Sequence, residues 1–595
     1  MDVEISLRER ILTDFNTNFM VEAGAGAGKT TLVIDRILNQ ITAPSRDGAP
    51  LKLEDIAAIT FTEKAANELK LRISSGIRKR IECETSKEKI QLLERAKLSI
   101  DDQFVGTIHS FCQELLRSNA FEAGLGLDYK VIDQDEDAQI KELVWQRYIL
   151  ENHAGLSEIM ARMDELGISL EEAKAAFDTI SRHEYSIIEF DPKAWEDDPP
   201  YLELMEMLNP LTEIFHYGPD GELETNFGEP INKVLNSPER KAFIPYYRNQ
   251  TGKGAIALAK ALSSKYDAEG TIFSKSYAKK GLCLYVIEGI DFEGMKTLCE
   301  AYYIYTYDVI MSIAYPAISE YTRYKREIMA VSFDDLLILT RNLLRDSKEA
   351  RERTRERYKC LYIDEYQDTD SIQSEIMFYL NGDDSDVCAP WSERKLIPGS
   401  TFIVGDPKQS IYRFRGADIY QYNKMKTIFE AAPGCEVVVL KKNFRTQSGI
   451  VRWVENIFKL PEGSKDELVD SGFGASRFLL NDPASWQASF YGMDAQRMDP
   501  DSQGEEIIKG VYSFLAGPLE RVDEYRRSEA AWVSGLIEKL VVENYLLQTF
   551  DVSTGTMETR HIQYGDFLIL LYNTKGMEDY ISALKDRNID RKSVV

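Results

Sequence analysis

Cysteine and histidine are scarce in this 595-residue sequence, which contains 7 cysteines and 5 histidines. The cysteines stand at positions 83, 112, 283, 299, 360, 388 and 435, and no two of them form a CxxC pair. Disulfide frameworks and metal sites need cysteines at characteristic short spacings. The sequence therefore argues against a disulfide scaffold and against a zinc or iron–sulfur site, and it predicts a reducing, cytoplasmic location.

Long hydrophobic runs are also missing. One of the longest is FLILL at 567–571, whereas a membrane-spanning helix needs roughly 20 apolar residues. The N-terminal stretch MDVEISLRERIL has no basic segment followed by an apolar core, so it does not have the pattern of a secretory signal. We therefore expect no membrane partner.

Positive charge is in deficit, because 72 lysines and arginines face 98 aspartates and glutamates, for a net charge of −26. Affinity for nucleic acid comes mainly from lysine and arginine, so this balance weakly opposes nucleic-acid binding. Net charge does not decide the character of a local site, however. The stretch IVGDPKQSIYRFRGAD, residues 403–418, gathers cations and aromatic rings directly after an apolar strand, and it is a candidate wall of a cationic groove.

Short apolar strands that end abruptly at polar loops recur along the chain. They occur in the stretches NFMVEAGAGAGKTT, DIAAITFTEKAANEL, YKCLYIDEYQDT, TFIVGDPKQ, CEVVVLKKNFRT and GDFLILLYNTKG. Strands that alternate with helices indicate an α/β fold with a parallel sheet. Ligands of such sheets bind outside the carboxyl ends of the strands. The polar loops therefore fall where a site is expected.

The length of the chain allows roughly three to four domains. Between residues 112 and 330 the pattern becomes mostly helical, and the tyrosine-rich run 301–325 is typical of a core helix. We expect a first α/β domain formed by residues 1–111 and 331–430, a helical insertion at 112–330, and a partial second α/β domain at 431–595.

The stretch AGAGAGKTT has the pattern of a phosphate-binding loop at the start of a helix. It consists of Ala23, Gly24, Ala25, Gly26, Ala27, Gly28, Lys29, Thr30 and Thr31. Backbone N–H groups at a helix N-terminus can hold phosphates, while Lys29 would reach the β- and γ-phosphates and the Thr30 hydroxyl would bind Mg²⁺. The alternative is a glycine-rich turn that only caps a helix.

Two further segments supply what a nucleotide site needs. In IDEYQDT, Asp364 can bind Mg²⁺ and Glu365 can orient or deprotonate water. Gln409, which follows another strand end, can sense the γ-phosphate. Together with the phosphate-binding loop, these residues predict hydrolysis of a nucleoside triphosphate.

Aromatic residues after the strands suggest contacts with single-stranded nucleic acid. Bases stack on such rings with roughly 1–3 kcal/mol each, which makes Tyr412 and Phe414 candidates, although both could be packing residues. Phe61 and Thr62 follow another strand, where Thr62 is an equally good helix N-cap. Thr107 and Ser110 offer hydroxyl groups suited to phosphate contact.

In this order, these stretches resemble the superfamily 1 DNA helicases of the UvrD/Rep/PcrA type. VEAGAGAGKTT and TFTEKAANEL are most similar to the RecB and AddA branch, the motor subunits of ATP-dependent exonucleases. The resemblance implies RecA-like domains, a requirement for ATP and Mg²⁺, and 3′→5′ movement on single-stranded DNA.

The resemblance also implies roles for individual residues. Lys29 and Thr30 would bind ATP–Mg²⁺, Asp364 the metal, and Glu365 would be the catalytic base. Gln409 would couple the nucleotide to DNA, Arg445 would contact the γ-phosphate, and Phe444 would stack on the adenine. The single-strand path would be lined by Phe61, His109, Tyr412, Phe414 and Arg415.

Two departures from the family pattern stand out. Arg8 occupies the position where members usually carry a glutamine that reads adenine, which puts adenine selectivity in doubt. The family also continues with two further motifs that are not found before Val595.

We therefore expect a helicase motor protein that acts on single-stranded DNA and duplex ends in recombination and double-strand break repair, with an exonuclease partner and weak turnover by itself. The alternative is a nucleotide- and DNA-binding module without turnover.

Overall fold

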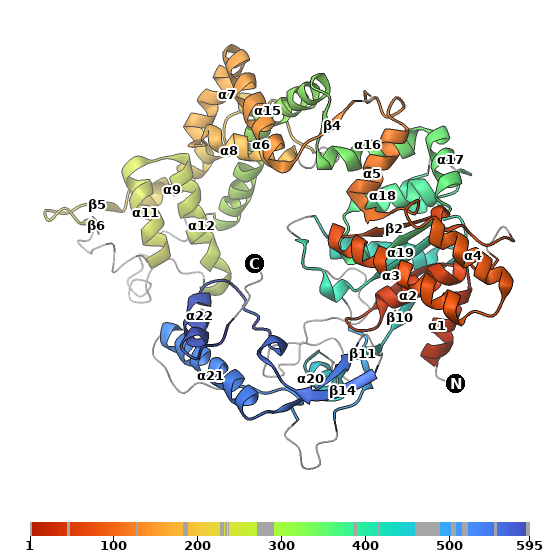
Figure 1. The fold of residues 1–595 in the computed structure, drawn as a ribbon. Helices are drawn as coiled ribbons and strands as arrows, with labels where there is room; N and C mark the ends of the chain where they lie inside the picture. Colours follow the sequence, from red (N-terminus) through yellow and green to blue (C-terminus); the bar gives the residue numbers. More distant parts are fainter. Residues whose placement is uncertain are drawn as a thin grey trace. The chain divides into compact units, whose positions relative to one another are not determined.

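The computed structural model describes most of the chain as two compact units. The residues described are 3–44, 48–126, 128–181, 188–226, 231, 235, 237–269, 291–385, 389–413, 416–458, 488, 490–500, 507–514, 522–551 and 556–590. Unit 1 combines Met1–Leu115 with Thr340–Val595, and unit 2 is Leu116–Leu339. The chain thus leaves unit 1 to form unit 2 and then returns (Figure 1).

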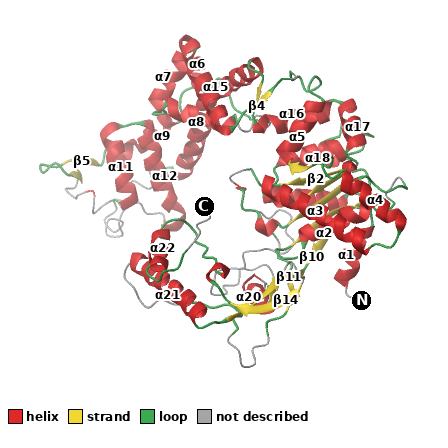
Figure 2. Ribbon diagram, viewed as in Figure 1, coloured by secondary structure: helices red, strands yellow, loops and turns green. Residues whose placement is uncertain are grey.

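A six-stranded parallel sheet forms the centre of unit 1 (Figure 2). Its strands are β1 (Asn18–Ala23), β2 (Ile56–Thr60), β3 (Val105–Thr107), β8 (Cys360–Ile363), β9 (Thr401–Gly405) and β10 (Cys435–Leu440). Their order across the sheet is β10-β1-β9-β8-β2-β3, and every neighbouring pair is parallel. The predicted α/β class with a parallel sheet is confirmed.

Helices cover both faces of this sheet, which is why its strands are apolar almost throughout. Helices α1 (Val3–Thr13), α2 (Lys29–Gln40) and α3 (Glu63–Cys83) share one core with alternate strand residues such as Val21. Helix α19 (Ile419–Ala431) lies on the other face, because its Lys426 pairs with Glu22, the neighbour of Val21 on β1. Helix α4 (Lys87–Leu98) packs on α3.

Strand β10 corrects the expected domain boundary. The sequence pattern placed residues from 431 onward in a second α/β domain, but β10 pairs with β1 along its whole length, from Asn18 and Cys435 to Ala23 and Leu440. The chain therefore completes the first sheet before it moves on. Sequence patterns identify strands but not their partners, and that limit explains the error.

The rest of unit 1 forms small sheets and helices. The elements are β11 (Lys442–Gln447), α20 (Ser448–Phe458), β12 (Asp494–Arg497), α21 (Val522–Val542), β13 (Leu546–Asp551), β14 (Thr556–His561) and α22 (Met577–Lys585). β11 pairs in parallel with β12, and β13 and β14 form an antiparallel hairpin.

The strand predicted at FLILL does not form a ladder with any described residue. The segment has the alternation of a strand, since Phe567 and Ile569 pack against the core of α21 and α22 while Leu568 and Leu570 are 77% and 82% exposed. The prediction of a strand is therefore wrong for the structure described. The apolar pattern correctly indicates which side chains of this segment are buried. Among the described residues, however, no neighbouring strand forms hydrogen bonds with its backbone.

Unit 2 is mostly helical, as the sequence predicts, with limits close to the expected 112–330. Its helices are α6 (Gln134–Glu151), α7 (His153–Leu166), α8 (Leu170–Ile180), α9 (Tyr201–Thr212), α11 (Ser237–Asn249), α12 (Gly252–Glu269) and α15 (Phe292–Glu327). Two small sheets accompany them, β4 (Lys130–Val131) with β7 (Ala330–Val331), and β5 (Phe215–Tyr217) with β6 (Leu223–Thr225). Helix α15 carries the tyrosine-rich run and buries Tyr302, Tyr305 and Tyr321 in the core of this unit, which confirms the predicted core helix.

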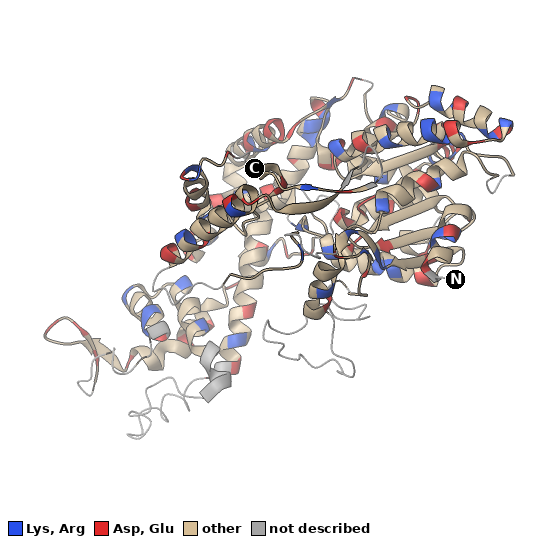
Figure 3. Cartoon of the chain, turned by 60° about the horizontal axis from the view of Figure 1, so that its bottom comes forward, with Lys and Arg blue, Asp and Glu red and all other residues tan. Residues whose placement is uncertain are grey.

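Acidic and basic side chains are interspersed over the helices of both units (Figure 3). In the part of the chain that the structure describes, no helix combines the length and the apolar character that crossing a membrane requires.

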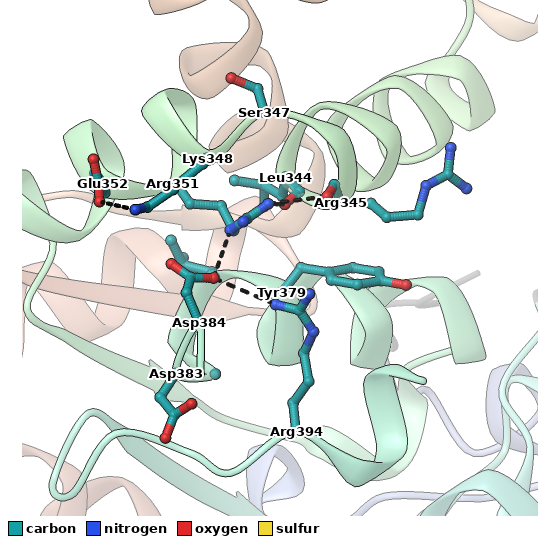
Figure 4. Close-up of polar contacts among 12 residues, drawn as sticks. Leu344, Arg345, Ser347, Lys348, Arg351, Glu352, Tyr379, Asp383, Asp384 and Arg394 are labelled. Atoms are coloured by element: carbon teal, nitrogen blue, oxygen red, sulfur yellow. Dashed lines mark hydrogen bonds and ion pairs between the residues drawn. The ribbon is translucent and has the colours of Figure 1, made fainter. Parts of the chain in front are cut away.

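A buried ionic cluster in unit 1 joins the end of α16 (Phe333–Asp346) with α17 (Lys348–Arg357) and the segment that follows α18 (Ser371–Asn381). Asp384 Oδ1 accepts a hydrogen bond from Arg351 Nε at 3.0 Å (Figure 4), and its Oδ2 accepts one from Arg355 Nη1 at 2.6 Å. Arg351 also donates to the carbonyls of Leu344 and Arg345 at the end of α16. Because the arginine side chains hold the last carbonyls of neighbouring helices, one carboxylate fixes several helix ends.

We predict that Asp384→Ala lowers the free energy of unfolding by about 3 kcal/mol, because the 1%-exposed side chain of Arg351 would lose its counter-ion. Asp383→Ala, at a neighbouring carboxylate that accepts hydrogen bonds from Ser385, is the matched control and should cost less than about 1 kcal/mol. Urea unfolding measures both values. Equal losses in the two variants would contradict the role of Asp384.

The same carboxylate should make stability depend on pH. Burial by itself would raise the pKa of Asp384, but the hydrogen bonds and charges of Arg355 and Arg351 lower it below the ordinary value on balance. A lowered pKa means that the stabilisation is present above the ordinary aspartate pKa and is lost as the pH falls through the folded-state pKa. The difference in stability between the native chain and Asp384→Ala should therefore shrink in strongly acidic buffer.

Candidate active site

The polar segments identified in the sequence meet at one edge of the six-stranded sheet. Because all six strands are parallel, their carboxyl ends lie at the same edge, and each is followed by one of these segments. The loop at 24–28 follows β1, Asp364 follows β8, Asp406 follows β9, and residues 441–446 follow β10. The same edge carries Phe61 after β2 and His109 after β3.

The glycine-rich loop leads from β1 directly into α2. Gly26 and Gly28 have φ values of +79° and +80°, in the left-handed region that favours glycine. Ala27 N–H donates to the Gly24 carbonyl at 3.1 Å, and α2 begins at Lys29. A glycine loop on a helix N-terminus is suited to an anion such as a phosphate.

Residues 443–445 are docked on the outer side of this loop. Asn443 Nδ2 donates to the Ala25 carbonyl at 2.8 Å, and Phe444 N–H donates to the Gly26 carbonyl at 2.9 Å. Asn443 Oδ1 accepts the N–H groups of Arg445 and Thr446, at 3.0 and 2.8 Å. This buried side chain therefore places Arg445 next to the loop.

Arg8, on helix α1, binds the same loop. Its guanidinium donates to the Ala27 carbonyl at 2.9 Å and to Glu4 at 3.2 Å, and it lies 5.2 Å from the ring centroid of Phe444, which is 52% exposed. The residue that replaces the expected glutamine thus supports the loop and the exposed ring together.

Carboxylates from the end of β8 face the loop. Lys29 Nζ lies 3.1 Å from Glu365 Oε2. Glu365 has a φ of +53°, which is unusual for a residue with a side chain and turns the chain sharply after Asp364. Asp368, three residues further on, is buried and also lies within the electrostatic influence of Lys29.

Burial dominates the electrostatics of these carboxylates. It raises the pKa of Asp364 to about 6, with a further increase from the charge of Glu365 and a partial reduction by Lys29. The pKa of Asp368 is raised to about 6 for the same reasons. Carboxylates whose pKa is strongly raised by burial are frequent at functional sites.

The side chains present fit a magnesium ion of the kind that accompanies nucleotides. Among the described residues, no group of three or more Asp, Glu, His or Cys forms a complete metal cage. Mg²⁺ bound with a nucleotide needs only one or two carboxylates, since phosphates and waters complete its shell. Asp364 and the Thr30 hydroxyl are the groups that would hold it.

Gln409 and Tyr412 connect the end of β9 with the aromatic residues. Gln409 Nε2 donates to Asp406 Oδ2 at 2.7 Å. The ring centroids of Tyr412 and Phe61 lie 4.6 Å apart at an interplanar angle of 34°, so the two rings pack against each other in a tilted arrangement. Phe61 and His109 also line one pocket together with Asp364 and Glu365.

The remaining residues that were predicted to contact nucleic acid are Thr62, Thr107, His109, Ser110, Phe414 and Arg415, and the hydroxyl groups among them bond to other groups of the protein. Thr62 Oγ1 accepts the N–H of Ala65 at 3.1 Å, which confirms the alternative that it caps α3. The hydroxyls of Thr107 and Ser110 both donate to Glu63. Burial lowers the pKa of His109, which favours the neutral form of its ring. Phe414 and Arg415 lie outside the described residues.

Two residues of the site were not singled out from the sequence. Asn443 precedes the predicted Phe444 and Arg445, and its position before two backbone N–H groups is the local signal of an Asx turn. Gln367 lies two residues after Glu365 and bonds to it at 2.8 Å. Nothing in the sequence shows that the amide of Gln367 would reach β9.

This combination of a parallel sheet, a glycine loop with a lysine, and strand-end carboxylates is that of a P-loop nucleotide-binding domain. Comparison with known proteins gives the family. The UvrD/REP helicase N-terminal domain matches residues 6–430, and the chain belongs to this family. The resemblance expected from the motifs is confirmed.

Similar proteins include several bacterial proteins that are named as one subunit of an ATP-dependent helicase/nuclease. The one from Natranaerobius thermophilus is 24% identical over 97% of this chain and 47% of its own length. Those from Clostridium perfringens and Carboxydothermus hydrogenoformans are 26% and 25% identical, over 95% and 94% of this chain and 48% and 47% of their own lengths. The chain thus spans about half the length of the curated relatives it matches.

We predict that Gly26→Ala disturbs the docking of residues 443–445. A Cβ atom at Gly26 would lie 2.7 Å from Arg445 Cβ and 2.8 Å from Asn443 Oδ1. Gly28→Ala is a matched control, because Gly28 has the same left-handed backbone but no atom within 4 Å of such a Cβ. Thermal unfolding should show Gly26→Ala to be less stable than Gly28→Ala by about 1–3 kcal/mol. Equal stabilities would contradict the docking.

Proposed function

We propose that this chain is the motor part of an ATP-dependent DNA helicase that moves 3′→5′ on single-stranded DNA. The observation that carries this proposal is the shared edge of the sheet, where the phosphate-type loop, the acidic residues and the Phe61–Tyr412 ring pair meet. The membership of the UvrD/REP family and the names of the relatives support the same function.

In the proposed mechanism, the loop at 24–28 and Lys29 bind the phosphates of ATP. Thr30 and Asp364 would hold Mg²⁺, which would neutralise phosphate charge. Glu365 orients and deprotonates the attacking water. Lys29, which pairs with Glu365 in the structure, turns to the phosphates when ATP binds. Arg445, held beside the loop by Asn443, stabilises charge on the transferred phosphoryl group.

In the proposed architecture, the six-stranded sheet belongs to a first RecA-like domain, unit 2 is an insertion in it, and residues 442–590 contribute to a second RecA-like domain. The proposed biological setting is recombination and double-strand break repair in the cytoplasm, with duplex ends as substrates and an exonuclease protein as partner. The relatives' name, which describes one subunit of a helicase/nuclease, supports this setting.

The first test is the rate of ATP hydrolysis with and without single-stranded DNA. We expect DNA to raise the rate, because Phe61 and His109 line one pocket with Asp364 and Glu365. Nucleotide binding without DNA-stimulated hydrolysis would favour the alternative, a binding module without turnover. The absence of both nucleotide and DNA binding would contradict the proposal altogether.

We predict that Lys29→Ala lowers the rate of ATP hydrolysis about 100-fold or more, because a preorganised positive charge on the phosphates is lost. Lys79→Ala, at an exposed lysine of α3, is the control and should hydrolyse ATP at the native rate. Steady-state phosphate release measures both. A native rate in Lys29→Ala would show that the loop is not the nucleotide site.

We predict that Tyr412→Ala weakens binding of single-stranded DNA about 5- to 150-fold, as expected for the loss of one stacked base at roughly 1–3 kcal/mol. Tyr412→Phe keeps the ring and should bind DNA within about twofold of the native affinity. Fluorescence anisotropy with a labelled oligonucleotide measures the dissociation constants. If Tyr412→Ala binds as well as Tyr412→Phe, the ring does not contact DNA.

A further inference from the structure

Gln367 occupies an unusual position between two strand ends. It lies in a single 3-10 turn, Tyr366–Asp368, that begins directly after the left-handed residue Glu365. Its side chain is almost fully buried, with 3% of the residue exposed. The positive φ of Glu365 is what turns Gln367 from the end of β8 toward the end of β9.

The side-chain amide of Gln367 bridges these two strand ends. Its Nε2 donates to Glu365 Oε2 at 2.8 Å, and its Oε1 accepts the backbone N–H of Asp406 at 2.8 Å. Its own backbone carbonyl accepts the hydroxyl of Ser410 at 3.0 Å. Gln367 therefore binds the 406–412 segment at two points, near its start and near its middle.

These bonds belong to a continuous series of polar contacts. Lys29 Nζ contacts Glu365 Oε2, which also accepts from Gln367. Gln367 accepts from Asp406, whose carboxylate accepts from Gln409 Nε2. The series begins at Lys29, directly after the glycine loop, and ends three residues before Tyr412, whose ring packs against that of Phe61.

We infer that Gln367 is a positioning residue that transmits the state of Lys29 to the 406–412 segment and thereby couples nucleotide binding to single-stranded DNA binding. This inference rests on the proposed function. A bound phosphate competes with Glu365 for the ammonium group of Lys29. When Lys29 turns to the phosphate, Glu365 Oε2 loses one of its two partners. The strength and geometry of its hydrogen bond with Gln367 then change.

The chemistry of the amide explains why glutamine is needed at this position. An amide has one end that donates and one that accepts, so it can face a carboxylate and a backbone N–H at the same time. A carboxylate in its place would repel Glu365, and an apolar side chain would leave the N–H of Asp406 buried without a partner. Gly405 leaves the space for this bridge, since a Cβ atom there would lie 2.9 Å from Gln367 Oε1.

The test measures coupling by binding rather than by turnover. The dissociation constant for a fluorescent oligothymidylate is determined with and without a non-hydrolysable ATP analogue plus Mg²⁺, and the ratio of the two constants is the coupling factor. We expect a factor of about 5 or more for the native chain, within the usual range for coupled sites. In Gln367→Glu and Gln367→Met the factor should fall to within about twofold of 1.

A matched control is available at the opposite end of β9. Asn381 is a buried amide that donates to the Ser400 carbonyl at 3.1 Å and to Thr401 Oγ1 at 2.8 Å. Asn381→Asp makes the same change from amide to carboxylate, between α18 and β9, without touching the series of contacts. We expect it to lower thermal stability and to retain the native coupling factor.

The outcomes separate the inference from the proposed function. A native coupling factor in both Gln367 variants, or an equal loss in Asn381→Asp, would overturn the role of Gln367 and leave the proposed function standing. A native chain that binds neither nucleotide nor DNA would overturn both. A native chain that binds both, but whose affinity for DNA is the same with and without the nucleotide, would overturn the inference alone. Loss of coupling in the Gln367 variants alone supports the inference. Because coupling is reciprocal, the analogue's affinity must change by the same factor when DNA is added.

Discussion

The common direction of the six strands is the constraint on which the site depends. Residues 24–29, 364–368, 406–409 and 441–446 are far apart in the sequence, and they meet only because β1, β8, β9 and β10 are adjacent and parallel. Each polar segment is held where an apolar strand stops. The burial of the strands in two layers of helices therefore fixes the positions of the charged groups at their ends.

Lys29 is the cation among the acidic residues that follow β8. It lies beside carboxylates that burial makes difficult to ionise, and its positive charge partly offsets that cost for Asp364, while it also pairs with Glu365. Such an arrangement leaves the lysine with two possible anionic partners, the protein's own carboxylate and a bound phosphate. The competition between them gives the site two states, and Gln367 is placed to pass the difference to β9.

The loop itself is held by residues that follow β10 and by Arg8 of α1. Asn443 and Phe444 bind the carbonyls of Ala25 and Gly26, and Arg8 binds that of Ala27. These hydrogen bonds to its carbonyl groups hold the loop in place. The same contacts bring Arg445 and the exposed ring of Phe444 to the loop, so the rigidity of the loop and the placement of these side chains have one cause.

The sequence by itself determined the parallel α/β class, the loop with Lys29, the helical character of 112–330 and the resemblance to the UvrD family. These features follow from local patterns: apolar runs that end in polar residues, glycines before a helix, and helical periodicity. Only the tertiary structure decided that β10 belongs to the first sheet and that FLILL has no described strand beside it. Only the tertiary structure showed that Gln367 and Asn443 bridge separate segments. Strand pairing and side-chain bridges join residues distant in the sequence, and their energies depend on which groups become neighbours after packing, which no local pattern contains.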